Sequence, residues 1–210
     1  MAGTIITVVA FCWLSTFLLC HLPHPFHIQK QKNFSYNIQI DTMAPLKVGD
    51  KFPEGVVFEW APITDADPTA CGRPQPYDAS KELKGKKFVI VSVPGAFTPG
   101  CQAFHIPPYV KNINAITSKG VDSVLVIASN DAWVMNAWGK VNGVSGEKLK
   151  FVSDTKSFFS KNHGWDAGMG DRNGRWAMVV EADGTISYAE NEKSPGEVQV
   201  SSAETVLGKL

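Results

Sequence analysis

The chain has 210 residues, 44% hydrophobic and 10% aromatic, which is enough for one sizeable core and too few for two ordinary domains. Its 20 basic and 20 acidic residues cancel, so overall charge favours neither nucleic-acid binding nor an anionic membrane surface. The four cysteines, at positions 12, 20, 71 and 101, are too sparse for a disulfide scaffold and form no C-x-x-C pair. Function must therefore be inferred from local motifs.

The first 42 residues differ in character from the rest of the chain. Thr4–Leu22 is strongly apolar, and the first charged residue is Lys30. No basic residue precedes the apolar run, so it makes a poor secretory signal, and it is short for a hydrocarbon core of about 30 Å. We expect residues 1–42 to be a leader, with a signal, an anchor or a non-functional extension left open, and residues 43–210 to be one domain.

The first half of this domain begins with strands. Val56–Trp60 predicts a strand, and Asp65–Tyr77, rich in Asp, Pro and Gly, predicts a loop that carries Cys71. Phe88–Val93 is a short, apolar, β-branched run, typical of a strand buried on both faces, and it leads directly into Pro94-Gly95. We expect this strand to be central.

A helix and a second buried strand follow. Apolar residues recur at helical spacing from Cys101 to about Ser118, and Pro107-Pro108 is expected to kink or restart that helix. Ser123–Ala128 predicts another buried strand. Asn130-Asp131 is a cap signal for a helix that runs to about Val141.

The last part of the chain predicts a hairpin between two short helices. Asp154–Lys161 indicates the first helix, and Ser202–Leu207 the closing one, which Ser201 or Ser202 can cap. Trp176–Glu181 and Thr185–Tyr188 predict strands around the turn Ala182-Asp183-Gly184. Parallel strands followed by an antiparallel hairpin indicate an α/β fold of thioredoxin-like arrangement, with a mixed central sheet and helices on both faces.

The segment PGAFTPGC, Pro94–Cys101, lies between a predicted buried strand and a helix start. A thiolate in the first turn of a helix faces unpaired N–H groups and the positive end of the helix dipole, which both favour it over the thiol. The Thr98 hydroxyl reaches the same space, and Pro99 restricts the backbone beside it. An isolated cysteine is more commonly an inert core residue, but the whole octapeptide favours a reactive thiol that can hold a peroxide.

This octapeptide, followed by His105-Ile106-Pro107, resembles the active-site signature of the peroxiredoxins. The resemblance is greatest to the subgroup of the type-five peroxiredoxins and the fungal alkyl hydroperoxide reductases, also called redoxins. It covers residues 43–210 and does not extend into the leader. His105 itself is interpreted as a structural hydrogen-bonding residue rather than a base.

In that family a Pro, a Thr, a Cys and a distant Arg form the site, which implies catalytic roles for Pro94, Thr98 and Cys101. Arg175 resembles the family's Arg immediately before an aromatic strand, and Arg172 is its competitor. The guanidinium would stabilise the thiolate and polarise the peroxide oxygens as charge moves onto the leaving oxygen.

The resemblance implies that the Cys101 thiolate attacks hydrogen peroxide or an alkyl hydroperoxide, giving a sulfenic acid and releasing water or an alcohol. Some type-five enzymes carry a resolving cysteine near the C-terminus, but Glu197–Ser202 contains none. The fungal branch has a loop cysteine some thirty residues upstream, and Cys71 matches that pattern. A disulfide between subunits of a homodimer, reduced by thioredoxin or glutaredoxin, is implied, with no cofactor or metal.

Two questions stay open from the sequence. A thioredoxin-fold binding or chaperone-like protein without turnover is the alternative function, although intact Thr98, Cys101 and Arg175 favour the peroxidase. We expect a cytoplasmic location. The alternatives are mitochondria, peroxisomes, because Gly208-Lys209-Leu210 weakly resembles the S-K-L signal, or membrane anchoring or secretion if the leader is functional.

Overall fold

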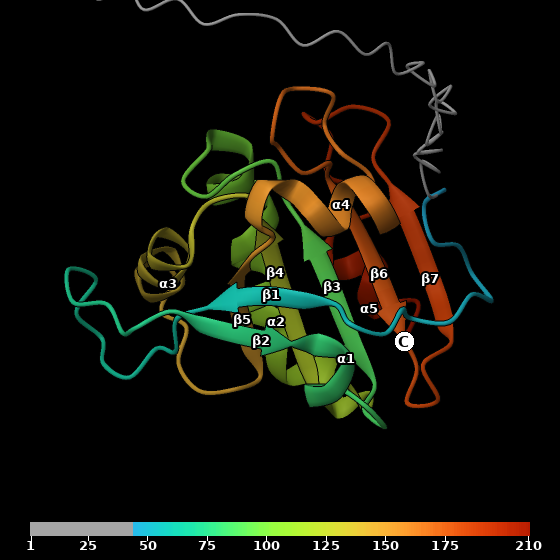
Figure 1. Cartoon of the computed structure of the whole chain (residues 1–210), viewed down its shortest axis with the longest axis horizontal. Helices are drawn as coiled ribbons and strands as arrows, with labels where there is room; N and C mark the ends of the chain where they lie inside the picture. The colour runs from blue at the N-terminus through green and yellow to red at the C-terminus, as the bar shows by residue number, and fades with distance from the viewer. Residues whose placement is uncertain (1–43) are drawn as a thin grey trace, which may run out of the picture. The chain divides into compact units, whose positions relative to one another are not determined.

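The computed structural model of the chain describes residues 44–210, so the predicted leader lies outside the described residues. This part of the chain forms a seven-stranded sheet with helices packed against it (Figure 1). The strands are β1 (Val57–Trp60), β2 (Gln75–Asp78), β3 (Phe88–Ser92), β4 (Ser123–Ala128), β5 (Leu149–Ser153), β6 (Trp176–Val180) and β7 (Ile186–Asn191). The helices are α1 (Ala79–Glu82), α2 (Ile106–Ser118), α3 (Ala132–Val141), α4 (Phe158–His163) and α5 (Ala203–Leu207), with a π-helical turn η1 (Cys101–His105) before α2 and a 3₁₀ turn η2 (Thr155–Ser157) before α4.

The sheet is mixed, with the strand order β2-β1-β5-β4-β3-β6-β7. β3, β4 and β5 run parallel to one another, whereas the pairs β3 with β6, β6 with β7, β5 with β1 and β1 with β2 are antiparallel. Every residue of β3 and β4 is buried, which confirms that these two apolar segments are interior strands.

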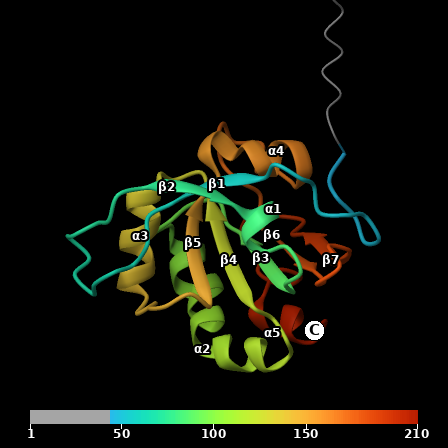
Figure 2. The same cartoon turned by 60° about the horizontal axis from the view of Figure 1, so that its bottom comes forward.

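Helices cover both faces of the sheet, as Figures 1 and 2 show from two directions. On one face α2, α3 and α5 enclose an apolar cluster that includes Tyr109, Trp138 and Val206. On the other face α1 and α4 enclose a second cluster that includes Leu83 and Phe159. Two apolar layers on either side of a mixed sheet confirm the predicted thioredoxin-like fold class.

Two caps and one turn formed where their sequence signals predicted them. The Asp131 carboxylate accepts from the Val134 N–H at 2.9 Å and begins α3, and Ser202 Oγ accepts from the Thr205 N–H at 3.2 Å and begins α5. Gly184, whose φ of +81° is in the region that favours glycine, lies in the turn between β6 and β7. The helix ends and the hairpin are therefore locally encoded.

Strands β2 and β5 were not predicted. β2 overlaps the end of the segment that was interpreted as a loop. Its Pro76 and its two exposed residues make it an edge strand without an apolar pattern. β5 is fully buried between β4 and β1, but Lys150 interrupts its apolar run. The Lys150 side chain is buried, and its ammonium group pairs with Glu147 at 2.9 Å.

The helix after β3 restarts at the two prolines, as predicted. Pro107 and Pro108 have no N–H to donate, and in regular α-helical geometry their rings would clash with the carbonyls four residues earlier. The preceding turn is therefore wider, and the Ile106 N–H bonds to the carbonyl of Cys101 five residues back. The nucleophile candidate thus begins a π-helical turn, a feature that is frequent at functional sites.

Candidate active site

Sheet topology brings the octapeptide and Arg175 to the same edge of the sheet. β3 ends there, and the antiparallel β6 begins there, because Ser92 at the end of β3 pairs with Trp176 at the start of β6. A buried hydrogen bond of 3.0 Å from Ser92 Oγ to the Gly174 carbonyl joins the two segments just beyond the ladder. The residues that follow β3 and those that precede β6 are therefore neighbours, although about 80 positions separate them.

Cys101 lies in the first turn of the helical segment. The Gln102 N–H donates to the Thr98 carbonyl at 2.8 Å and closes the first helical turn. Within residues 44–210, no hydrogen bond takes up the Cys101 N–H, as expected for a first-turn amide. The side chain is a free thiol packed in the core with no exposed surface. The unpaired N–H therefore lies in the first helical turn, at the positive end of the helix dipole.

Thr98 faces the site as a hydrogen-bond acceptor. Its Oγ1 donates to the Gly95 carbonyl at 2.8 Å, which uses the hydroxyl hydrogen and leaves lone pairs free for the O–H of a peroxide. The loop holds a strained shape, since Phe97 has a φ of +59°, which is uncommon for a residue with a side chain. A bond of 2.8 Å from the Ala96 N–H to Asn130 Oδ1 supports that shape. Sequence reasoning assigned Asn130 only a capping role and missed this contact.

Arg175 lies beneath the octapeptide with only 4% of its surface exposed. Nε donates to the Pro195 carbonyl at 2.8 Å, and Nη1 donates to His105 Nδ1 at 3.0 Å. Nη2 faces the residue before the nucleophile, because a methyl carbon added to Gly100 would lie 3.3 Å from it. The third nitrogen of the guanidinium is thus directed toward the Cys101 turn.

Arg172 also reaches the octapeptide, but from solvent. Its side chain is exposed, and Nη1 donates to the Pro94 carbonyl at 3.2 Å. A methyl carbon added to Gly95 would lie 2.9 Å from the same nitrogen. The structure therefore brings both candidate arginines to the loop, and only Arg175 is buried beside the turn that carries Cys101.

His105 is a buried neutral bridge. Burial, and secondarily the nearby charge of Arg175, lowers its pKa from 6.5 to about 4. Because an arginine can only donate, Nδ1 must be the acceptor, and Nε2 carries the hydrogen that bonds the Ser201 carbonyl at 2.8 Å. The interpretation of His105 as a hydrogen-bonding residue fits this geometry, although its partner Arg175 was not foreseen.

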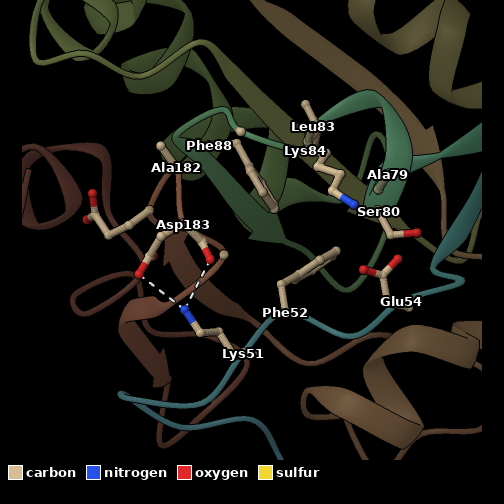
Figure 3. A pocket seen from close by; sticks show the side chains of 13 residues that line it. Lys51, Phe52, Glu54, Ala79, Ser80, Leu83, Lys84, Phe88, Ala182 and Asp183 are labelled. Atoms are coloured by element: carbon tan, nitrogen blue, oxygen red, sulfur yellow. Dashed lines mark hydrogen bonds and ion pairs between the residues drawn. The ribbon is translucent and has the colours of Figure 1, made fainter.

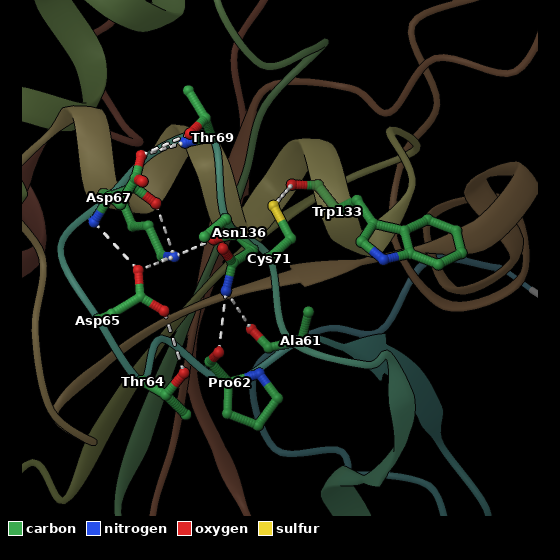
Figure 4. Close-up of polar contacts among 11 residues, drawn as sticks. Ala61, Pro62, Thr64, Asp65, Asp67, Thr69, Cys71, Trp133 and Asn136 are labelled. Carbon is green, nitrogen blue, oxygen red and sulfur yellow. Dashed lines mark hydrogen bonds and ion pairs between the residues drawn. The ribbon is translucent and has the colours of Figure 1, made fainter.

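Cys71 is not part of this cluster in the reduced structure. It is exposed on the loop between β1 and β2, and its Sγ lies 3.8 Å from the Trp133 carbonyl at the start of α3 (Figure 4). Trp133 itself is 54% exposed, and its ring points away from the Cys71 sulfur. The structure thus groups Pro94, Thr98, Cys101 and Arg175 but leaves Cys71 on the surface.

The Cys71 loop is attached to α3 at several points (Figure 4). The Lys140 ammonium is almost fully buried and donates to Asp65 Oδ1 at 2.9 Å, to the Asp67 carbonyl at 3.0 Å and to the Ala70 carbonyl. Asn136 Nδ2 donates to the carbonyls at the start of the loop. A segment that its composition indicated as a simple loop is therefore held in one shape by two side chains of one helix.

A separate cavity of about 490 Å³ lies at the opposite end of the sheet (Figure 3). Phe52 and Phe88 meet edge to face in its floor, with centroids 5.1 Å apart, and an ion pair between Lys51 and Asp183 lies at its rim. No cysteine lines it. Residues 44–210 also hold no group of three or more His, Cys, Asp or Glu side chains arranged for a metal ion.

Comparison with known proteins gives the same class as the fold and the site. The redoxin family profile matches residues 47–207. Peroxiredoxin Pen c 3 of Penicillium citrinum is 46% identical over 167 residues, which cover 79% of this chain and 99% of that protein. A reduced Prx3 from Vibrio vulnificus, solved in complex with H₂O₂, superimposes with a TM-score of 0.65 at 30% identity and covers 79% of this chain and 99% of that one.

The chain therefore belongs to the peroxiredoxins of the redoxin family. Members of this family are peroxidases that reduce hydroperoxides with a thiol reductant, and this chain is an enzyme of that class. A relative from Lipomyces kononenkoae, 44% identical over 167 residues that cover 77% of this chain and 99% of that protein, is described as peroxisomal. Among residues 44–210, none of the helices has the length and apolar character needed to cross a membrane.

Proposed function

We propose that Cys101 is the peroxidatic nucleophile, with Thr98 and Arg175 as its partners and Pro94 as part of the loop that shapes the site. The observation that carries this assignment is that Cys101, whose N–H is unpaired, follows Gly100, which Nη2 of the buried Arg175 faces. The thiolate attacks the near oxygen of ROOH, the O–O bond breaks, and the sulfur becomes a sulfenic acid, while the departing RO⁻ takes up a proton from water and leaves as ROH. The H₂O₂ complex of the Vibrio vulnificus protein supports hydrogen peroxide as a substrate, and alkyl hydroperoxides are proposed with it.

The displacement of negative charge during the reaction assigns a role to each polar group of the site. In the transition state, negative charge moves from the sulfur to the departing oxygen, and donors aimed at that oxygen stabilise it most. Arg175 Nη2 and the Cys101 N–H are suitable donors, whereas the Thr98 hydroxyl, already committed as a donor to the Gly95 carbonyl, accepts the hydrogen of the incoming peroxide. This arrangement orients the O–O bond along the line of attack.

The proposed catalytic cycle continues through Cys71. Its exposed thiol attacks the Cys101 sulfenic acid of a second subunit, water leaves, and an intersubunit disulfide forms, which thioredoxin or glutaredoxin then reduces. Because Cys101 is fully buried and Cys71 is exposed, the π-helical turn must open for the two sulfurs to meet. Two exposed aromatic residues, Phe104 at 70% in the η1 turn that Cys101 begins and Trp133 at 54% in α3, supply apolar surface suited to a homodimer.

Replacement of the nucleophile tests the central assignment. Cys101→Ser should consume no peroxide above background, because a serine hydroxyl stays protonated and cannot replace a thiolate. Cys71→Ser is the matched control and should still consume one equivalent of peroxide in a single turnover. Peroxide consumption by Cys101→Ser at the wild-type rate would overturn the assignment, whereas the absence of turnover in wild type would favour the binding or chaperone-like alternative.

The proposal extends to the domain boundary and the location. We take residues 43–210 as the catalytic domain and residues 1–42 as a leader that catalysis does not need. The cytoplasm is the proposed location, with mitochondria as an alternative. The peroxisomal alternative draws support from the Lipomyces kononenkoae relative and from the terminal Gly208-Lys209-Leu210. Fluorescent fusions that keep or block each terminus would distinguish these locations.

A further inference from the structure

We propose that the segment from Glu192 to Ser201 positions the side chain of Arg175. The buried Glu192 carboxylate stabilises the conformation of this segment. The inference rests on the proposed role of Arg175 and extends it to residues that neither approach the peroxide nor lie in the octapeptide. Glu192 directly follows β7 and is only 5% exposed, and its carboxylate takes no part in the proposed attack on the peroxide.

The segment contacts Arg175 directly at two points. The Glu192 N–H donates to the Arg175 carbonyl at 2.8 Å, which extends the pairing of β6 and β7 by one residue and fixes the backbone of the arginine. Further along, the Pro195 carbonyl accepts from Arg175 Nε at 2.8 Å and fixes the plane of the guanidinium. Both ends of the arginine are therefore held by the chain that leaves β7.

A third contact passes through His105. Nη1 of Arg175 donates to His105 Nδ1, and His105 Nε2–H donates to the Ser201 carbonyl. The Tyr109 hydroxyl donates to the same carbonyl at 2.7 Å, so two buried side chains of the η1–α2 segment depend on the position of Ser201. With Nε and Nη1 engaged in this way, Nη2 is the nitrogen directed at Gly100 and the Cys101 turn.

Glu192 holds the far end of the segment. Its Oε1 accepts from the Gln199 N–H at 2.7 Å, from the Ser201 N–H at 2.8 Å and from Ser201 Oγ at 2.7 Å. A buried carboxylate is costly unless several donors satisfy it, and here all three donors lie seven to nine residues further along the chain. The carboxylate thus closes the segment into a loop and sets the position of the Ser201 carbonyl on which His105 depends.

The positioning role makes a specific prediction about energetic coupling. An arginine side chain has many rotamers, and loss of its fixed acceptors lets Nη2 leave the Cys101 turn. Replacement of the Glu192 side chain should therefore slow the attack of Cys101 on peroxide only when Arg175 is present. If the segment were merely structural, its loss would instead lower stability without such dependence on the arginine.

The test compares Glu192→Ala with Glu192→Gln and with the control Glu190→Ala, an exposed glutamate on the same strand. We expect Glu192→Ala to lower the second-order rate constant of Cys101 oxidation by about tenfold to 100-fold, on the scale of a lost positioning contact. Glu192→Gln keeps an acceptor oxygen and should restore most of the rate, and Glu190→Ala should match wild type. Stopped-flow measurement of one turnover separates this step from recycling.

A double-mutant cycle decides the outcome. In an Arg175→Met background, Glu192→Ala should cause no further loss, because the group that it positions is gone. A wild-type rate in Glu192→Ala, an equal further loss in the Arg175→Met background, or no rescue by glutamine would overturn the proposal. If Glu192→Ala does not fold, His105→Leu replaces it in the double-mutant cycle with Arg175→Met, and His105→Gln replaces Glu192→Gln as the conservative variant. These variants test the contact between His105 and Arg175. A wild-type rate in Arg175→Met alone would instead overturn the proposed function of Arg175.

Discussion

Gly100 faces Arg175 so closely that a methyl carbon on its Cα would lie 3.3 Å from Nη2 of the guanidinium. The two residues are far apart in sequence and come from different strand ends, yet no side chain separates them. The absence of a side chain at Gly100 lets the buried arginine approach the first turn of the helical segment. The guanidinium of Arg175, which is only 4% exposed, is thereby placed next to the residue that precedes Cys101.

Arg175→Met should slow peroxide reduction by about 10²-fold to 10³-fold, the usual scale for the loss of one electrostatic stabiliser of developing charge. The second-order rate constant for oxidation of Cys101 measures this effect. Arg172→Met is the matched control, because Arg172 also donates to the octapeptide but from an exposed position. It should lower the rate by less than about tenfold, and the reverse order of the two variants would assign the role to Arg172.

Cys71→Ser should stop turnover supported by thioredoxin while leaving the first reduction of peroxide intact, because the resolving thiol acts only after the sulfenic acid forms. Oxidised wild type should migrate at twice the subunit mass on a non-reducing gel, and the variant should not. Replacement of both Cys12 and Cys20, outside the described residues, serves as the control and should leave the doubled band in place. An oxidised wild type that migrates as a monomer would exclude the intersubunit disulfide.

Lys140→Met should loosen the loop that carries Cys71. Its ammonium donates to the Asp65 carboxylate and to two carbonyls of the loop. In the variant, hydrogen bonds from water to these acceptors replace only part of the lost free energy of stabilisation. We expect a loss of about 1–2 kcal/mol of stability and faster alkylation of Cys71 by iodoacetamide. Lys161→Met, which removes an exposed ion pair with Asp171, should leave the alkylation rate unchanged.

The protein should lose stability as the pH falls from about 6.5 to about 4 because of His105. Burial lowers its pKa to about 4 in the folded protein, so within this window the unfolded chain binds the extra proton and the folded protein does not. The free energy of unfolding thus rises with pH here, by up to about 3 kcal/mol across the window. Urea unfolding at several pH values measures this slope.

His105→Gln provides the comparison for this pH dependence, since glutamine can accept from Arg175 and donate to Ser201 but does not titrate. The variant should lack the slope, while other buried groups act equally on both proteins. Asp154 is one of them, with burial raising the pKa of its carboxyl, so it favours the folded state as the pH falls. If wild type and His105→Gln have identical slopes, His105 binds a proton equally well in the folded and unfolded states, which would contradict this prediction.

Features encoded over a few neighbouring residues were predictable from the sequence. The apolar runs of β3 and β4, the Asp131 and Ser202 caps, and the proline restart of α2 depend on local pattern and backbone restriction. The octapeptide Pro94–Cys101 is also contiguous, so the strand that precedes it and the helix that follows it already place its thiol in a first helical turn. None of these features depends on a residue that is distant in the sequence.

Features that depend on strand order were not predictable in this way. His105 and Arg175 are 70 positions apart and meet only because the antiparallel β6 lies beside β3. The same holds for Lys140 and the Cys71 loop, and for β2 and β5, whose patterns are interrupted by a proline or a lysine. Local sequence specifies which residue is reactive, whereas packing of distant segments decides which charges, carbonyls and hydroxyls surround it, because those contacts follow from burial of the whole sheet.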